Sequence, residues 1–478
     1  MKIGPGNFIP GLKWEEDMYL TEQFAEFIHD LKYEDLPPEI VSLAKERILD
    51  SVGAILAGGA NWAYREPFLD ACDKMGEGDV PGFTTGKRTY PLARALMIDT
   101  TFGHAVELDD GHKFAGAHAG TAVVPTALTI GALKGLSGKE VITAVVIGYD
   151  IVYRIAAAMA PAQIDKGFHP TSNDDTLGAA ATAGRLMGLS KEELANALGL
   201  AGLYASGLME ATVTGQLSKC VMVGNSAASA MEAIYMAQNG MEGTVSVFEG
   251  KNGFFHAKSS NVDVKAVGRG LGTEFLITDT YSKMYPTCRH AQPAIEGVLN
   301  LMEEYGFGPE QVDHIWVGTH EVACTLTGKI KAPADSGEAK FSAAYGIGVA
   351  LYEKGFGVCH LNQEYTQDPR YLSMAERVTV EWDHDVQSVY PTRRGAKVKV
   401  YLKDGRVLGT EVYDLKGSPN NPVGFGEIKN KFTANVGTLM PKEEMGRLIE
   451  RIMKLETLDS PAEILEIVCR KMGMQGEK

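Results

Sequence analysis

Carboxylates and imidazoles gather in one short stretch of the sequence, HAVELDDGHKFAGAHAG, from His104 to Gly120. The glycines indicate a loop that leads into a buried helix. Carboxylates can orient imidazoles, and an imidazole near its working pKa can exchange a proton with a substrate. Two other interpretations are a Zn, Mn or Fe site and a helix cap with a charged loop. We favour metal-free acid/base chemistry by the ionisable groups of this stretch, Glu107, Asp109, Asp110, His112 and His118.

A second polar segment, KGFHPTSNDDTLGAAATAG, contains His169 directly before Pro170. Its run of Thr, Ser, Asn and Asp is typical of a helix start and predicts a cap for a helix at Leu177. Free N–H groups at such a start bind carboxylates. Taken alone, His169 fits a structural histidine with satisfied hydrogen bonds better than a catalytic one.

Lys219, in TGQLSKCVMVGNSAASA, is the only charge between Glu210 and Glu232. A cation in so apolar a neighbourhood must reach out to solvent or face a pocket, so it is a candidate to hold an anion. Cys220 beside it is a possible nucleophile, although a small buried apolar residue is the favoured interpretation.

Three cations surround Pro286 in the segment YSKMYPTCRHAQPAIEG, at the point where the sequence pattern changes. Such a group at a domain boundary suits an anionic ligand in an interdomain cleft. A solvated basic turn is the alternative, and the segment alone slightly favours it. The three cations are Lys283, Arg289 and His290.

Helical periodicity runs from about Thr21 to Asn252, with apolar residues three and four positions apart. Pro37 and Pro38 open one helix, and Ser190 stands three residues before Glu193 as in a capping box. Gly58 and Gly240 are candidate helix stops. Segments that are apolar nearly all round predict a bundle of closely packed, buried helices.

Strand-like alternation begins after about Asp279, in HIWVGTHEVAC, RVTVEWD and AKVKVYLKDGRVLGTEVYD. The Asp404-Gly405 pair predicts a hairpin turn, and helical runs lie among these strands. The helical period returns in the last sixty or so residues. We therefore expect a mainly α protein, in which a helical-bundle domain built from residues 1–278 and 413–478 holds an inserted α+β lid at residues 279–412.

Composition narrows the functional classes. The formal charge is -15, from 46 Lys and Arg against 61 Asp and Glu, which opposes binding to nucleic acid or to anionic membranes. An anionic substrate therefore requires cations gathered locally. The six scattered cysteines form no CxxC pair, the start lacks a signal-peptide pattern, and the uncharged stretch from Phe114 to Leu133 is a poor membrane span. These features predict a cytoplasmic protein.

Together and in this order, the four segments resemble the MmgE/PrpD family, which includes 2-methylcitrate dehydratase, cis-aconitate decarboxylase and iminodisuccinate epimerase. LDSVGAILAGG, LGLAGLYASGLME and AKFSAAYGIGVAL add to the resemblance, which covers nearly the whole chain. It implies a helical domain made from both chain ends, an inserted lid, a homodimer, and a site between domain and lid that uses neither cofactor nor metal.

The resemblance also implies roles for individual residues. His118 and His169 resemble the acid/base imidazoles, and Lys219 and Lys283 resemble the cations that hold substrate carboxylates. A further set, Glu107, Asp110, His112 and Arg289, is expected to line the substrate site. This chain departs from the pattern at Glu107, where relatives commonly have Asp, and at Gly111, where the aconitate decarboxylase has Thr. The segment after Lys219 departs too, because Cys220-Val221-Met222 replaces a Pro-Leu-His run.

The resemblance implies proton removal beside a carboxylate of a small di- or tricarboxylic acid. One imidazole takes the α proton, and the other delivers a proton to a departing β-hydroxyl in a dehydratase or to the opposite face of carbon in an epimerase. Dehydration is the first expectation and epimerisation the second. A binding protein that keeps the fold without catalysis, and a metal-dependent hydrolase, are the remaining alternatives.

Overall fold

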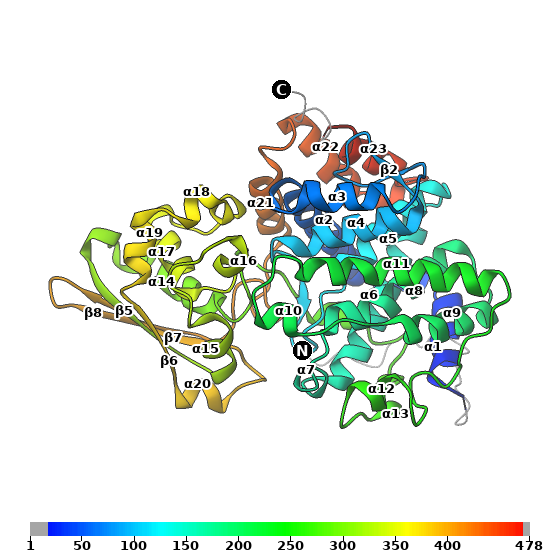
Figure 1. Cartoon of the computed structure of the whole chain (residues 1–478), viewed down its shortest axis with the longest axis horizontal. Helices are drawn as coiled ribbons and strands as arrows, with labels where there is room; N and C mark the ends of the chain where they lie inside the picture. Colours follow the sequence, from blue (N-terminus) through cyan, green and yellow to red (C-terminus); the bar gives the residue numbers. More distant parts are fainter. Residues whose placement is uncertain (1–17, 472–478) are drawn as a thin grey trace.

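The fold is mainly α, with a large helical domain and a smaller α+β lid, in a computed structural model that describes residues 18–471. In Figure 1 the helical domain occupies the right-hand side and the lid the left. The start of the chain, in which the sequence shows no signal-peptide pattern, lies outside the described residues. The expected fold class is confirmed.

Within the described residues, twelve longer helices build the helical domain, and the central ones are buried on nearly every face because neighbouring helices surround them. They are α1 (Leu20–Asp30), α2 (Pro38–Asn61), α3 (Arg65–Asp73), α4 (Leu92–Ala105), α5 (Gly120–Leu133), α6 (Gly138–Met159), α8 (Pro170–Met187), α9 (Lys191–Tyr204), α11 (Lys219–Gln238), α21 (Phe425–Val436), α22 (Lys442–Met453) and α23 (Ala462–Lys471).

Short elements connect these helices. They are η1 (Tyr33–Asp35), β1 (Val80–Pro81), β2 (Thr89–Tyr90), β3 (Gly111–His112), α7 (Ala162–Asp165), α10 (Glu210–Val213), α12 (Phe254–Lys258), α13 (Val264–Val267), η2 (Leu276–Asp279), β4 (Thr280–Tyr281) and η5 (Leu455–Thr457). Strand β4 pairs antiparallel with β3, so the chain touches the acidic segment of the helical domain directly before it enters the lid.

The expected helix starts are confirmed at two positions. Pro38 is the first residue of α2, and Ser190 forms a reciprocal capping box with Glu193 at the start of α9. Gly240 follows the end of α11 with a positive φ of 81°, as a stop residue should. Gly58 was expected to stop α2, and this is wrong, because α2 continues to Asn61.

Gly58 serves close packing instead. A Cβ at this position would lie 1.9 Å from the carbonyl oxygen of Phe102, so the missing side chain lets α2 lie against α4.

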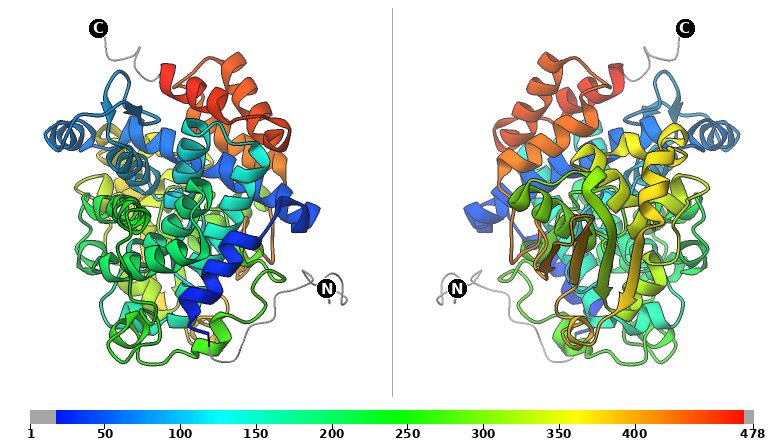
Figure 2. Two further views of the ribbon diagram at one scale, coloured as in Figure 1. Left: turned by 90° about the vertical axis from the view of Figure 1, so that its right-hand side faces the viewer. Right: turned by 90° about the vertical axis from the view of Figure 1, so that its left-hand side faces the viewer.

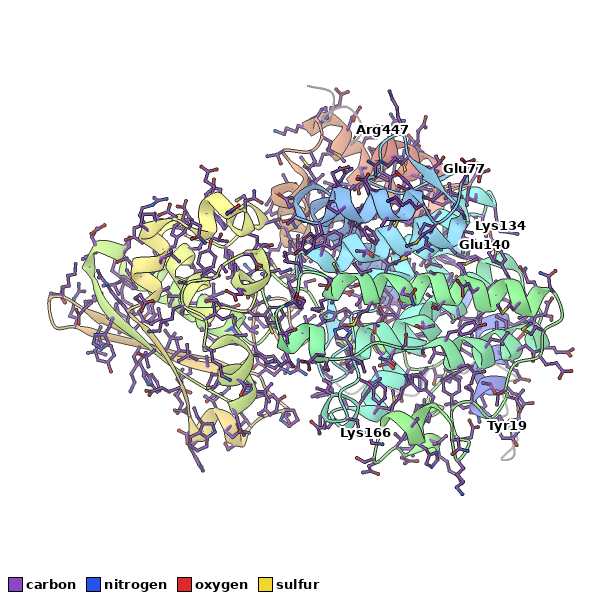
Figure 3. All side chains as sticks on the ribbon, viewed as in Figure 1. Tyr19, Glu77, Lys134, Glu140, Lys166 and Arg447 are labelled. Atoms are coloured by element: carbon purple, nitrogen blue, oxygen red, sulfur yellow. The ribbon has the colours of Figure 1, made fainter. Side chains whose placement is uncertain are left out.

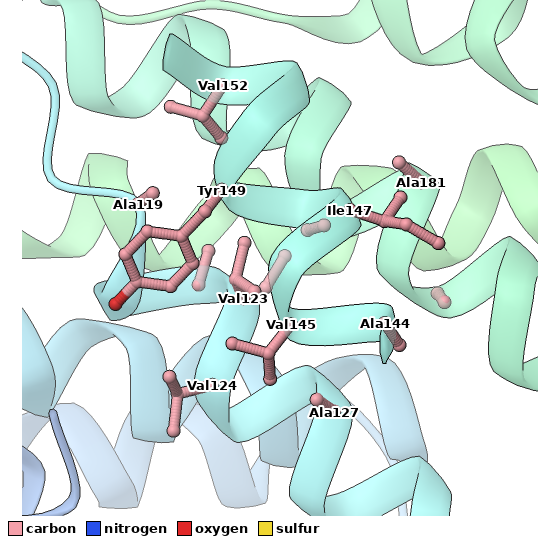
Figure 4. Close-up of a cluster of buried hydrophobic side chains, with 14 of the residues drawn as sticks. Ala119, Val123, Val124, Ala127, Ala144, Val145, Ile147, Tyr149, Val152 and Ala181 are labelled. Carbon is pink, nitrogen blue, oxygen red and sulfur yellow. The ribbon is translucent and has the colours of Figure 1, made fainter. Parts of the chain in front are cut away.

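Helices α5, α6 and α8 form the centre of the domain. Small and β-branched side chains such as Val123, Val145, Ile147 and Ala181 interdigitate there (Figure 4). Helix α6 is long and apolar enough to cross a membrane, but most of it is buried inside the protein. It is therefore best described as a core helix.

The lid has a four-stranded sheet in the order β6-β5-β7-β8, with β5 parallel to β6 and antiparallel to β7. Helices α14 and α17 pack against the sheet and share its core (Figure 2). The lid elements are α14 (Gln292–Tyr305), η3 (Pro309–Gln311), β5 (Val312–Thr319), α15 (Glu321–Thr327), α16 (Ser336–Ala339), α17 (Ala343–Glu353), η4 (Val358–Leu361), α18 (Gln363–Thr366), α19 (Pro369–Ala375), β6 (Val378–Trp382), α20 (His384–Ser388), β7 (Ala396–Leu402) and β8 (Val407–Val412).

One of the two strand predictions is confirmed, and the other is wrong in part. The Asp404-Gly405 hairpin is confirmed, since β7 and β8 pair antiparallel around Gly405 at φ 90°. The run HIWVGTHEVAC was expected to be strand throughout, but β5 ends at Thr319 and the EVAC part opens α15. The His320 side chain accepts a hydrogen bond from the backbone N–H of Ala323 and caps that helix, an effect that alternation of apolar residues does not report.

The C-terminal helices return to the helical domain. Helices α21 and α22 pack on α2, and α23 packs on α5, so residues from both chain ends share one core (Figures 1 and 2). A second core lies mainly in the lid and includes Ala54, Ala57, Val106 and Leu108 of the helical domain. This packing supports the expected domain limits near residues 279 and 412, which stay a prediction.

Charged side chains such as Glu77, Lys134 and Arg447 lie on the outer surface of the helical domain (Figure 3). Lys283 is different, because its side chain is only 1% exposed. Buried cations need carboxylate partners, and the partners of Lys283 lie in the candidate site.

Candidate active site

The acidic stretch after α4 forms a buried loop that ends at the start of α5. Glu107, on this loop, has a left-handed backbone with φ 53°, which is uncommon for a residue with a long side chain. Such a conformation costs about 1–3 kcal/mol and persists only where surrounding contacts enforce it. Those contacts are two lysines.

The carboxylate of Glu107 lies between Lys219 and Lys283. Lys219, the first residue of α11, donates to Oε1, and Lys283 donates to Oε2 at 3.0 Å. Burial alone would raise the pKa of Glu107, but the two lysines outweigh it and hold the pKa well below its usual range. The structure thus joins two cations that the sequence places far apart.

Asp109 is a second acceptor at the same place. Lys283 Nζ lies 3.2 Å from Oδ1, and His104 Nδ1 lies 2.6 Å from Oδ2. Burial opposes its ionisation, but Lys283 and the neighbouring imidazoles hold the pKa of Asp109 well below its usual range. For the same pair, burial lowers the pKa of Lys283, yet Asp109 and Glu107 raise it overall. These groups form one buried ionic network.

His118 is held in a defined tautomer. Its Nδ1 donates to the backbone carbonyl of Asp110 and lies 3.4 Å from Asp109 Oδ2. Among the described residues, no hydrogen bond involves its Nε2. Burial lowers the pKa of His118 to about 3, although Asp109 opposes this shift. A neutral imidazole with a free Nε2 lone pair results, which is the form a base requires.

His169 is held in the opposite tautomer. It is the N-cap of α8, and its Nδ1 accepts a hydrogen bond of 3.2 Å from the backbone N–H of Ser172. The ring therefore carries its proton on Nε2. Burial first, and then Lys219, lower the pKa of His169 well below its usual range. The expected helix start at Leu177 is too late, because α8 begins at Pro170 and the Thr/Ser/Asn/Asp run lies inside it.

A third imidazole joins these two, and the sequence interpretation missed it. The His104 ring lies with its centroid 5.4 Å from that of His118 and 5.8 Å from that of His169. Burial lowers its pKa. His104 stands on the last turn of α4, directly before the acidic stretch, so its position in that polar segment was the available signal.

Lys340 was missed as well. It is a buried lid residue whose Nζ donates to the carbonyl of Ala105 at 2.8 Å, and burial lowers its pKa. A lone cation directly before the apolar run of α17 was the signal. With Gly337 and Phe341 it forms the lid wall of a cavity whose other wall includes His104, Glu107 and Lys219.

Two expected residues, Asp110 and His112, do not line this cavity. The Asp110 carboxylate accepts from Tyr149 Oη at 2.6 Å, and burial raises its pKa to about 6. The His112 ring packs 4.8 Å from that of Tyr153, and its Nδ1 accepts from the N–H groups of Phe114 and Ala115. The structure does not bring either side chain to the lysines.

Arg289 lies elsewhere too. Its guanidinium stacks 4.4 Å over the ring of Tyr281 and lines a different cavity from that of Lys219. Tyr281 also approaches His118, with ring centroids 6.5 Å apart. Gly111 makes room for this, since a Cβ there would lie 2.6 Å from Tyr281 Oη and 3.0 Å from His118 Nδ1.

Within residues 18–471, no group of three or more His, Cys, Asp or Glu side chains is arranged to hold a metal ion. The described part of the chain therefore offers no set of donor side chains for the metal interpretation of the acidic stretch. Burial raises the pKa of the Cys220 thiol to about 12, which agrees with a buried apolar role.

Comparison with known proteins identifies the family of this chain. Residues 22–266 match the MmgE/PrpD N-terminal domain, and residues 285–455 match the MmgE/PrpD C-terminal domain. The chain is 25% identical to the cis-aconitate decarboxylase of Mus musculus, over 92% of this chain and 91% of that protein. It is 24% identical to the cis-aconitate decarboxylase of Aspergillus terreus, over 94% and 96%.

A 2-methylcitrate dehydratase from Salmonella typhimurium is 22% identical over 66% of this chain and 67% of that protein. The similar proteins are thus enzymes with carboxylic acid substrates in their names. Because the two domain matches cover most of the sequence, in the order and positions of the two domain types, the chain belongs to the MmgE/PrpD family.

Proposed function

We propose that this protein is a lyase that transfers a proton next to a carboxylate of a small polycarboxylic acid, with dehydration as the leading reaction. The observation that carries the proposal is the pair of opposite tautomers at His118 and His169. One ring offers a lone pair at Nε2 and the other offers an N–H at Nε2. A base and a hydrogen-bond donor are the two functions that a β-elimination requires.

The proton path follows from these tautomers. His118 Nε2 takes the α proton, while His169 Nε2–H donates to the departing β-hydroxyl. His169 stays neutral, because a proton on Nδ1 would face the N–H of Ser172. The His118 imidazolium then gives its proton to the hydroxyl, so that water leaves and the free base returns. Every atom lost from the substrate is accounted for in that water molecule.

The lysines supply the charge that this reaction needs. Electron density builds up beside a carboxylate in the transition state, and a cation on that carboxylate stabilises it. Lys219, Lys283 and Lys340 outnumber Glu107 and Asp109 by one charge, so the cavity attracts an anion. A bound dicarboxylate then raises the pKa of the nearby imidazoles towards neutrality and makes His118 a stronger base.

The lid must move for substrate to enter. The cavity between Lys219 and Lys340 holds about 10 Å³, which is room for roughly one water molecule. A polycarboxylic acid therefore needs Lys340 and Phe341 to withdraw and return. Closure would exclude water and strengthen each electrostatic contact.

Decarboxylation is the second candidate, since cis-aconitate decarboxylases match this chain over more of its length than the dehydratases do. The Gly111 departure weighs against it, because a Thr side chain there would meet Tyr281 and His118. Epimerisation needs a second proton-transfer group for the opposite face of carbon, and His104, whose ring centroid lies 5.4 Å from that of His118 and 5.8 Å from that of His169, is the candidate.

Proton NMR in D2O separates these reactions. The purified protein is incubated with methylcitrate, citrate, cis-aconitate, tartrates, iminodisuccinate and substituted succinates. A new vinyl signal indicates dehydration, loss of an α-proton signal alone indicates epimerisation, and loss of carbon dioxide indicates decarboxylation. The proposal fails if a substrate is turned over equally fast after His118→Gln.

A binding protein that lost catalysis is the alternative from another class. The opposite tautomers of His118 and His169 argue against it, since binding of an anion requires the lysines but not a base beside a hydrogen-bond donor. Calorimetry that detects saturable binding of a panel member, without turnover by NMR over days, would favour this alternative.

We also propose a homodimer in the cytoplasm. The exposed apolar residues Leu203, Leu208 and Val213, between the end of α9 and α10, support a protein interface. Six free cysteines agree with a reducing compartment. Sedimentation of the wild type and of Leu208→Lys tests the dimer, which predicts that the variant is monomeric.

A further inference from the structure

A second cavity, of about 230 Å³, lies where the chain crosses between the helical domain and the lid. It shares no lining residue with the cavity of the candidate active site. Both crossings of the chain contribute to its wall, Tyr281 and Arg289 on the way into the lid and Tyr413 and Ser418 on the way back. Lys113 of the helical domain and Arg394 of the lid complete the set on which the inference depends.

Four cations and one carboxylate line this cavity. Two cations are neutralised, since Lys113 Nζ lies 2.5 Å from Asp279 Oδ1 and Arg393 pairs with Asp414. Arg289 and Arg394 have no carboxylate within 4.0 Å among the residues that the structure describes. In a chain with a net charge of -15, two guanidiniums that line one cavity without a carboxylate partner are unexpected.

Arg289 is fixed in place. It donates to Gln292 Oε1 at 2.9 Å and to Ser418 Oγ, and its guanidinium lies over the ring of Tyr281. Burial lowers its pKa to about 10, so it remains charged at neutral pH. A buried, oriented guanidinium without a carboxylate is pre-organised for an anion.

Arg394 approaches from the lid. Its Nε is buried and has no hydrogen-bond partner within the described part of the chain. After burial, its charge is the next cause that lowers the pKa of His320, and it also lowers that of Arg289, which places it close to both. A guanidinium that lines the cavity and keeps an unused N–H donor can bind an oxyanion.

We propose that this cavity is a second anion site, in which Arg289 and Arg394 bind the phosphate or carboxylate group of a small molecule. The guanidinium forks match the oxygen pairs of both groups. Since one arginine belongs to the crossing and the other to the lid, a bound anion joins the lid to its hinge. Occupancy therefore reduces lid motion without contact to His118 or Lys219.

Calorimetric titration of the full-length protein with sodium phosphate, and separately with sodium succinate, at constant ionic strength tests the proposal. Lys219→Gln is used as the background, so that anion binding at the candidate active site is weakened. We expect saturable binding of at least one anion, and a dissociation constant raised about 10-fold or more by Arg394→Gln. Arg406→Gln, which removes an exposed arginine paired with Asp404 outside the cavity, should leave it unchanged.

Hydrogen–deuterium exchange provides a second measurement. Phosphate or succinate should slow exchange in residues 282–291 and 413–421, and Arg394→Gln should abolish this protection. Circular dichroism confirms that the variant is folded. The proposal is overturned if neither anion binds saturably, or if Arg394→Gln binds as tightly as its parent.

Discussion

Lys283 Nζ lies 3.0 Å from Glu107 Oε2, and both side chains are almost completely buried although 176 residues separate them in the chain. Strand β4 brings them together. It lies just before Lys283 in the chain and pairs with β3, which follows the acidic loop. This contact joins the helical domain to the start of the lid. It also sets the charge of the candidate site.

Replacement of Lys283 should therefore reduce stability as well as activity. Lys283→Gln leaves Glu107 and Asp109 without their shared cation, and loss of one partner in a buried ion pair costs about 3–5 kcal/mol. Lys219→Gln leaves Lys283 in place and should mainly lower kcat/KM. Urea unfolding compares the free energies of unfolding, and equal stabilities of the two variants would contradict the network described above.

His118→Gln and His169→Gln should each lower kcat by about 10²–10⁴-fold while the protein stays folded. The reason is that each ring presents a different form of Nε2 to the substrate. His314→Gln is the control, since this lid histidine is half exposed and stacks on Tyr401. Near-full activity of either site variant on the true substrate would remove that histidine from the mechanism.

The pH dependence of kcat/KM should reflect the low pKa of His118, about 3 in the free enzyme. A base works when unprotonated, so a lowered pKa extends activity to lower pH. Between pH 7 and pH 5, after correction for substrate ionisation, kcat/KM should fall far less than the roughly 25-fold loss of a base with pKa 6.5. A full loss over this range would show that His118 titrates normally or is not the base.

Gly111→Ala tests the contact between Tyr281 and His118. The added Cβ would lie 2.6 Å from Tyr281 Oη, so the tyrosine and His118 must shift. Displacement of a catalytic group by about 1 Å lowers turnover by up to about 10²-fold. Gly405→Ala, at a hairpin tip far from the site, is a control for general strain. Unchanged kcat in Gly111→Ala would mean that the site tolerates movement of Tyr281.

Asp174→Asn tests a buried carboxyl group on α8. Burial raises its pKa to about 8, and Gln163 Nε2 donates to it at 3.0 Å. A raised folded-state pKa means that stability is fully present below pH 4 and is lost as pH rises to about 8. The neutral amide avoids this loss, so Asp174→Asn should gain roughly 1 kcal/mol or more over wild type between pH 5 and pH 8. Thermal unfolding at both pH values measures the difference, and a constant difference would refute the raised pKa.

Much of the fold could be predicted from the sequence because local patterns determine it. Ser190 with Glu193 marks a capping box in any tertiary context, and Asp404-Gly405 marks a hairpin for the same reason. The mainly α class and the inserted lid follow from where the apolar period changes along the chain. Gly58 shows the limit, because only its contact with Phe102 explains it.

The chemistry of the candidate site was also visible in part. The sequence alone determined that this chain concentrates imidazoles, carboxylates and isolated lysines in a few segments of an otherwise apolar, acidic protein. Their roles as acid/base and anion-binding groups stay predictions. Which of them meet was decided by the tertiary structure, since pairing of β3 with β4 and packing of the lid set distances that no local pattern encodes.

Those distances separate the predicted residues into two places. Lys283 joins Lys219 at Glu107, whereas Arg289, six residues further on, turns into a different cavity. His104 and Lys340 also line the candidate site, although the sequence interpretation did not include them. Residue type determines what a side chain can do, but burial and the nearest charges determine its protonation state. Only the folded chain sets that burial and those charges.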